Sequence, residues 1–304
     1  MMLSLILIVC LNLVCLNSQR IPKHEYKKYV KNETLIRSVR ESEEYLYTTN
    51  NVLCKVLLFF SSTLESHWGS SDHISQFKYL WPIALRKNAM LRNADILIYA
   101  SVALHSANNV ISPDNKQYNI SATPPYLYYE LHQAALSFPN KNVTLKYINN
   151  VGYQQGAVKV MLDGLNEGWF NGYDWVIRLN PDTMIYDDTR LASYMNNNTC
   201  TVVLANGKKN DILLLSDFFA FRPDRVDYSR WDRAYMTAHA ETWTTKAFSY
   251  LVSSNQHIWI QAAPDQCMWR VFQADILHAH YKWEDQLYRF FNTSHVIWTD
   301  NYCP

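Results

Sequence analysis

Apolar residues follow two periods along the first two thirds of the chain, one typical of strands and one typical of helices. Short β-prone apolar runs predict buried strands at 51–60, 95–101, 142–148 and 173–179. Between these runs, apolar residues recur at helical spacing at 79–94, 127–136 and 155–166. Strand and helix therefore alternate, which is the pattern of a parallel sheet with right-handed crossovers.

The pattern changes after residue 182. Apolar runs predict strands at 200–206, 218–223 and 273–279, and helical spacing predicts helices at 230–242 and 245–252. These elements either continue the sheet with mixed strand direction or build a second lobe. We expect an α/β fold, with a mainly parallel, Rossmann-like sheet flanked by helices and a mixed C-terminal part.

An apolar run at 3–16 opens the chain, and polar residues, an arginine and several lysines follow it. The run matches the hydrophobic region of a secretory signal peptide and is shorter than the roughly 20 residues that span a bilayer. An uncleaved anchor needs positive charges on its cytosolic side, whereas the charges here follow the run. We expect a signal peptide at 1–18, or a short signal anchor, a polar segment at 19–50 and a single domain at 51–304. The domain is expected in the ER or Golgi lumen or outside the cell, with a membrane contact only if the leader stays uncleaved.

Charge and cysteine content narrow the class of protein. The formal net charge of the 304 residues is +1, from 28 basic and 27 acidic residues, so nucleic acid is not an expected partner. Cysteines beyond the leader permit two disulfides in an oxidising compartment, with their connectivity open. Sequons for N-glycosylation, which agree with a secreted glycoprotein, occur at Asn32, Asn119, Asn142, Asn197 and Asn292.

Several common catalytic motifs are missing from the sequence. The chain has only 7 glycines and contains neither G-x-G-x-x-G nor a Walker phosphate loop, which excludes the ordinary dinucleotide-binding and P-loop classes. It also lacks G-x-S-x-G and H-E-x-x-H, the motifs of α/β-hydrolases and zinc metalloproteases. The candidates that remain are acidic residues at the ends of strands.

The fourth predicted strand ends in Asn180-Pro181-Asp182. Asn-Pro is a common turn opener, so a plain loop is one interpretation. In an open α/β sheet, however, ligands bind beyond the carboxyl ends of the strands, where a carboxylate can hold Mg²⁺ or Mn²⁺ together with nucleotide phosphates. Residues 180 and 182 point to the same side of an extended tip and Pro181 fixes the backbone between them, so two oxygen-bearing side chains converge.

This element, placed after the strand WVIRL, resembles the Asp-x-Asp element of nucleotide-sugar glycosyltransferases with the GT-A fold, and the order of elements before it agrees. The run from Tyr153 to Asp182, with the later segments SDFFAFRP and PDQCMWRVF, is similar to nucleotide-diphospho-sugar transferases. The resemblance covers about 51–280 in outline and 153–223 in detail. It implies a GT-A-like fold, a UDP- or GDP-linked sugar donor, and Mn²⁺ or Mg²⁺ bound directly by Asp182. Asn180 stands where the family often has its first Asp, and it keeps a carbonyl acceptor while losing the charge.

The resemblance also implies residues for the nucleotide. Ser61 and Thr63 end the first predicted strand, where GT-A enzymes usually hold the base or ribose. Gln154 and Gln155 open the helix before the fourth strand, and a helix N-terminus favours an anion. Strand ends and helix caps need polar residues in any case, so a structural role is the alternative for all four.

Acidic and histidine residues near the C-terminus complete the candidate set. Asp217 is expected to line the acceptor side and Asp265 to support the donor or acceptor sugar, and either can act as general base if the reaction inverts configuration. A cap and a solvated turn are their structural alternatives. His278 and His280 share one face of an extended segment, and related transferases bring a C-terminal His to the metal. Each histidine can instead be an ordinary surface or core residue.

The sequence therefore predicts a glycosyltransferase that moves a sugar from a nucleotide-diphosphate-sugar to a hydroxyl on a glycan or glycoprotein. A cation at Asp182 is expected to act as a Lewis acid on the leaving diphosphate. Two other classes stay open. One is a secreted carbohydrate-binding protein on an inactive glycosyltransferase-like scaffold, which Asn180 favours. The other is a glycoside hydrolase with Asp217 and Asp265 as its carboxylate pair.

Overall fold

The computed structural model describes residues 54–64, 70–111, 117–149, 153–206, 214–231, 239–261 and 276–278. All of them belong to the unit Asn51–Pro304. The predicted leader and polar segment, together with Asp265 and His280, lie outside the described residues. Within the described ranges, no helix is both long and apolar enough to cross a membrane.

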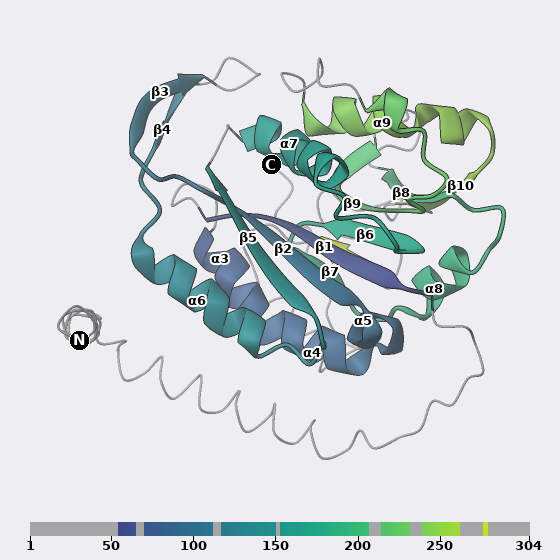
Figure 1. Cartoon of the computed structure of the whole chain (residues 1–304), viewed down its shortest axis with the longest axis horizontal. Coiled ribbons are helices and arrows are strands. Elements are labelled where there is room, and N and C mark those ends of the chain that lie inside the picture. The colour runs from purple at the N-terminus through teal and green to yellow at the C-terminus, as the bar shows by residue number, and fades with distance from the viewer. Residues whose placement is uncertain are drawn as a thin grey trace, which may run out of the picture. The chain divides into compact units, whose positions relative to one another are not determined.

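A seven-stranded sheet forms the centre of this unit, in the order β10-β8-β9-β6-β1-β2-β5 (Figure 1). Strand β9 runs antiparallel to β6 and β8, and the other neighbouring strands pair in parallel. The expected α/β fold, with a mainly parallel sheet flanked by helices and a mixed C-terminal part, is confirmed. The strands of the sheet are β1 (Val56–Thr63), β2 (Asp95–Val102), β5 (Val143–Asn149), β6 (Trp175–Leu179), β8 (Val202–Asn206), β9 (Leu214–Phe221) and β10 (His257–Gln261).

Helices cover both faces of the sheet (Figure 1). One face carries α7 (Tyr153–Asn166) and α9 (Ala240–Ser253). The other face carries α3 (Ser70–Ser75), the π-helix η2 (Gln76–Leu80), α4 (Trp81–Lys87), α5 (Ala89–Asn93) and α6 (Pro125–Leu136). Smaller elements are the hairpin of β3 (Ala107–Ile111) and β4 (Gln117–Ile120), the pair of β7 (Thr183–Ile185) and β11 (Ile276–His278), α8 (Thr189–Met195) and the 3-10 turn η3 (Tyr228–Arg230).

Burial on both faces explains why the strands read as continuous apolar runs rather than alternating ones. On the α7 and α9 face, Phe59 of β1 packs with Phe170, and Phe219 of β9 packs with Phe248 of α9. On the opposite face, the ring of Phe60 meets that of Trp81 edge-on, with 4.5 Å between centroids. The sheet is thus held between two aromatic-rich layers.

Two predicted helices differ from the structure. The helix predicted at 79–94 is divided into η2, α4 and α5, with a break at Asn88, whose backbone is extended. The prediction of a helix at 230–242 is wrong at Trp231, whose backbone is not helical, and it agrees with α9 from Ala240 on. Residues 232–238 lie outside the described residues. Trp231 follows η3 with non-helical backbone and is buried against Phe170, Phe221 and Trp243, so tertiary packing overrides the helical pattern there.

The cysteine prediction is only partly open to comparison. Cys54 and Cys200 are free cysteines, and the Cys200 thiol donates to the carbonyl of Val202. Cys267 and Cys303 lie outside the described residues. The disulfide prediction stays a prediction.

Candidate functional site

The Asn180-Pro181-Asp182 tip follows β6 at the carboxyl edge of the sheet and is fixed by three hydrogen bonds. The Thr183 amide donates to the Asn180 carbonyl over 3.0 Å, which closes a β-turn. The Asn180 amide donates to the Asp217 carbonyl over 3.0 Å, and the Trp81 indole donates to the Pro181 carbonyl over 2.9 Å. The tip is therefore a hydrogen-bonded turn whose backbone is held by the neighbouring strand β9 and, from one face of the sheet, by α4.

Asn180 and Asp217 also meet through their side chains. The Asn180 amide nitrogen, Nδ2, donates to Oδ1 of Asp217 over 2.6 Å. Leu179 of β6 pairs with Phe218 of β9 in an antiparallel ladder, so Asn180, which follows Leu179, lies opposite Asp217, which precedes Phe218. Asp217 and Asp182 are both buried, at 7% and 3% exposure. A residue expected on the acceptor side thus touches the Asp-x-Asp-like element.

Arg178 lies two residues before Asn180 and is 1% exposed. Burial lowers the pKa of its guanidinium to about 10, against an opposing effect from Asp217, Glu241 and Asp182 in that order. A group with that pKa still carries its charge at neutral pH. Its Nε and Nη1 are buried and have no hydrogen-bond partner in the part of the chain that the structure describes.

Glu241, in the first turn of α9, accepts a hydrogen bond of 3.0 Å from the Ser216 hydroxyl. It joins Arg178, Asn180, Asp182 and Asp217 in a set that we call the β6 network. Three carboxylates in this network act on one guanidinium. The arrangement gathers negative charge at the carboxyl end of β6.

The remaining nucleotide candidates lie in β1 and α7. Ser61 and Thr63 are half-buried within the end of β1, where the sequence predicts them. Ser61 follows Phe60, which pairs with Leu179 of β6, so the backbone of Ser61 lies beside that of Asn180. Gln154 and Gln155 lie in the first turn of α7, which follows β5, and β5 is three strands from β6 in the sheet. Nucleotide contacts by these four residues stay a prediction.

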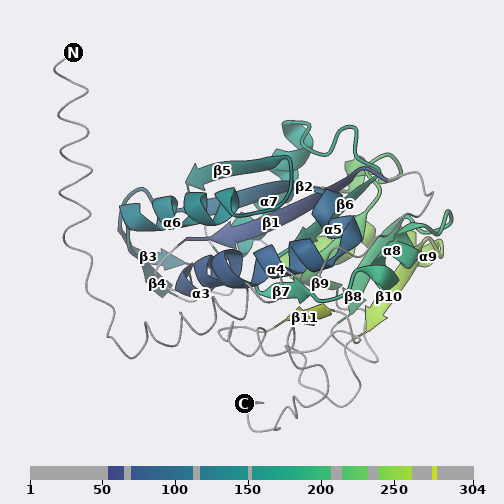
Figure 2. The same ribbon diagram turned by 90° about the horizontal axis from the view of Figure 1, so that it is seen from below.

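The pairing of β11 with β7 places the backbone of His278 close to that of Asp182. Strand β11 pairs antiparallel with β7, and His278 is opposite Thr183, the residue after Asp182 (Figure 2). Asp265 and His280 cannot be placed because they lie outside the described residues.

A divalent cation fits the chemistry of the side chains present. Mg²⁺ and Mn²⁺ take oxygen ligands and need only one or two protein carboxylates when phosphates supply others. Asp182, Asp217 and the Asn180 carbonyl offer that kind of donor. The described residues contain no group of three or more His, Cys, Asp or Glu able to hold a metal.

Arg178, Glu241 and Trp81 were not among the residues predicted from the sequence. An arginine inside the otherwise apolar strand WVIRL was the available signal for Arg178, since buried arginines are rare without a partner. Glu241 and Trp81 approach the tip from distant elements, and no local pattern identifies them.

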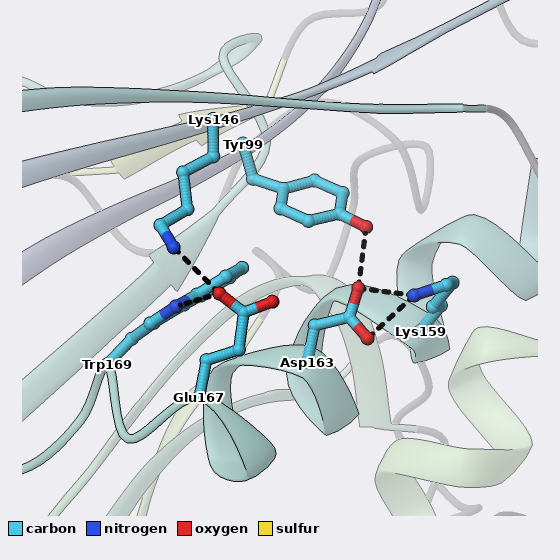
Figure 3. A network of polar contacts seen from close by, with 6 residues as sticks. All are labelled: Tyr99, Lys146, Lys159, Asp163, Glu167 and Trp169. Carbon is cyan, nitrogen blue, oxygen red and sulfur yellow. Dashed lines mark hydrogen bonds and ion pairs between the residues drawn. The ribbon is translucent and has the colours of Figure 1, made fainter.

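A second group of polar side chains lies on the same face of the sheet and has no member in common with the β6 network. Tyr99 and Lys159 both contact the Asp163 carboxylate, and Lys146 and the Trp169 indole both contact Glu167. We call this group the α7 network, and Figure 3 shows how its members face one another. Each of its two acids has both a cation and a neutral donor.

Comparison with known proteins finds similarity to solved structures alone. No protein-family model and no curated protein matches the chain. The apo structure of the bifunctional glycosyltransferase WbbM is similar with a TM-score of 0.39 and 12% identity, over 67% of this chain and 38% of that one. A glycosyltransferase involved in glycosylation of the major capsid of PBCV-1 is similar with a TM-score of 0.35 and 7% identity, over 67% of this chain and 80% of that one. The match covers well under half of the length of WbbM.

Proposed function

We propose that the chain is a glycosyltransferase that moves a sugar from a nucleotide-diphosphate-sugar to a hydroxyl acceptor on a glycan or glycoprotein. The observation that carries the proposal is the buried Asn180-Pro181-Asp182 turn at the carboxyl end of β6, joined to Asp217 by a side-chain hydrogen bond. Carboxylates at this edge of an α/β sheet are where a phosphate-bearing ligand and its cation are expected. The proposed compartment is the secretory lumen or the cell exterior.

The residues divide into three proposed roles. Asp182 would hold Mn²⁺ or Mg²⁺ with the donor diphosphate, and His278 would add a ligand from β11. The bound cation supplies Lewis-acid stabilisation of the leaving diphosphate. Asp217 would accept the proton of the acceptor hydroxyl if the reaction inverts configuration, and Ser61 and Thr63 would contact the base or ribose.

Nucleotide release tests this function. The purified protein without the predicted leader is incubated with a panel of UDP- and GDP-sugars, with Mn²⁺ and then with chelator. Release from one donor, lost with chelator, supports the transferase and identifies the sugar. Silence across the panel from a folded sample contradicts it, and glycan binding or nucleotide-independent hydrolysis then decides between the two other classes.

A further inference from the structure

The contact between Asn180 and Asp217 depends on the residue at position 180 being an amide. Nδ2 of Asn180 donates to Oδ1 of Asp217 over 2.6 Å. An aspartate at position 180, as in the usual Asp-x-Asp element, would set two carboxylates at that distance, and like charges so close disfavour the ionised form of one of them. The amide of Asn180 is therefore complementary to the carboxylate of Asp217 on β9.

Arg178 approaches the same acid from the core side of the sheet. Its position in β6 is opposite Phe59 of β1 and Phe219 of β9, and its guanidinium lies 5.9 Å from the Phe219 ring centroid. Among the carboxylates that act on it, Asp217 has the largest effect. Because Nε and Nη1 have no hydrogen-bond partner in the described residues, this guanidinium adds charge to the pair without the full set of bonds that would make it a simple structural link.

We propose that Asn180 and Arg178 are positioning residues for Asp217, with Asn180 fixing one carboxylate oxygen and Arg178 supplying the opposite charge from the core. Asp217 then carries the negative charge that the usual element has at its first position. This inference rests on the proposed function, in which Asp217 acts on the acceptor hydroxyl. It explains the departure from Asp-x-Asp as a move of one carboxylate from β6 to β9, so that the site keeps its charge.

Exchanging the two side chains separates positioning from structure. Asn180→Asp puts two carboxylates in contact, and the double variant Asn180→Asp/Asp217→Asn restores one amide and one carboxylate with their places reversed. A matched control is Asn142→Asp, because Nδ2 of Asn142 donates to Oδ1 of Asp95 over 2.7 Å at an exposed place outside the site. Since Asn142 belongs to a sequon, all the proteins are produced without N-glycosylation. Thermal unfolding in chelator and steady-state transfer are measured for all the proteins.

Asn180→Asp is expected to lower the unfolding temperature by about 4–8 °C, and the exposed control by less than about 2 °C. The double variant is expected to regain the stability of the wild type to within about 2 °C. Its kcat is expected to stay about 100-fold below the wild type with an unchanged KM for the donor, because its carboxylate is on the wrong strand.

Three results would overturn the inference. Asn180→Asp as stable as its control would show that the pair does not interact. A double variant that remains as unstable as Asn180→Asp would show that the pair does not share one charge. A double variant as active as the wild type would assign the pair a structural role alone. A wild type with no transferase activity contradicts the proposed function instead, while the unfolding measurements still decide the pairing.

The contribution of Arg178 is tested by a conservative pair of variants. Arg178→Lys keeps the charge and loses the planar guanidinium, whereas Arg178→Met loses both. Arg178→Lys is expected to unfold at a higher temperature than Arg178→Met, and both are expected to lose about tenfold or more in kcat with little change in donor KM. An Arg178→Met protein with the wild-type kcat would remove Arg178 from the proposal.

Discussion

The β6 and α7 networks lie on the same face of one sheet and differ in how their charged groups are paired and exposed. In the α7 network, Asp163 accepts from Tyr99 and Lys159, and Glu167 accepts from Lys146 and Trp169 (Figure 3). Its ion pairs lie near solvent, with side chains 15–54% exposed. In the β6 network, Arg178, Asp182 and Asp217 are buried, and two nitrogen atoms of the Arg178 guanidinium have no partner among the described residues.

The difference separates a stabilising arrangement from one that costs stability. Paired charges close to water contribute little but carry no desolvation penalty. A buried guanidinium with missing hydrogen bonds is expensive, and such local conflicts in natural proteins concentrate at functional sites. We therefore expect variants of the β6 network to change activity more than stability and variants of the α7 network to do the reverse.

The largest expected effect is the loss of activity on replacing Asp182. Asp182→Asn keeps the shape of the side chain and removes the proposed cation ligand, so transfer is expected to fall by about 10³-fold, on the order of 4 kcal/mol. Its free energy of unfolding is expected to stay within about 1 kcal/mol of the wild type, since a buried charge is removed. Nucleotide-release kinetics and denaturant titration measure the two quantities. Unchanged activity in Asp182→Asn would contradict the proposed difference between the two networks.

A packing variant beneath the α7 network comes next. A Cβ added to Gly164 of α7 would lie 2.2 Å from Cζ of Phe170, which is buried in the core. Gly164→Ala is expected to cost about 2 kcal/mol of unfolding free energy from overpacking, after about 1 kcal/mol of gained helix propensity. Denaturant titration measures it, and transfer per folded molecule is expected to stay at the wild-type level. A more stable variant would show that Phe170 has room to move.

Asp163→Asn is the α7 counterpart of Asp182→Asn. It removes the ion pair with Lys159 while keeping an acceptor for the Tyr99 hydroxyl, and it is expected to cost about 1 kcal/mol of unfolding free energy. Activity is expected to be unchanged because Asp163 lies outside the β6 network. A loss of transfer in a folded Asp163→Asn protein would contradict the division between the two networks.

The smallest expected effect is the pH dependence of the α7 network. Burial, followed by the nearby Asp163, raises the pKa of the Tyr99 hydroxyl above its usual value near 10. Since the folded state holds this proton more tightly, the resulting stability is fully present below about pH 10 and is lost as the pH rises further. Denaturant titrations at pH 9 and 11 are expected to show a smaller alkaline loss in Tyr99→Phe than in the wild type. Equal alkaline losses of stability in the two proteins would show that Tyr99 does not cause the loss.

The sheet was predictable from the sequence because its signals are local. Apolar runs such as the one that forms β6, separated by helical spacing, are sufficient to predict parallel strands with crossover helices. The Asn180-Pro181-Asp182 tip was predictable for the same reason, since it directly follows such a run. The helix predicted at 230–242 was wrong at Trp231, because the burial of Trp231 is a tertiary effect.

The connections within the site were not predictable. Asp217 reaches Asn180 across 37 residues of sequence, because β9 enters the sheet antiparallel to β6. Arg178 is visible in the sequence only as an odd residue in an apolar strand, and its acidic neighbours come from β9, α9 and the tip. The roles of Asn180 and Arg178 follow from strand register and burial, which no local pattern specifies.

Binding of a nucleoside diphosphate tests the central claim most directly. Thermal unfolding of the wild type and of Asp182→Asn is measured with UDP or GDP, each with Mn²⁺ and with chelator. The account predicts that one of the two nucleotides raises the unfolding temperature of the wild type in Mn²⁺, because a ligand bound only by the folded state stabilises it. It predicts no such rise with chelator or in Asp182→Asn. A wild type that responds to neither nucleotide, or a variant that responds as strongly as the wild type, would contradict it.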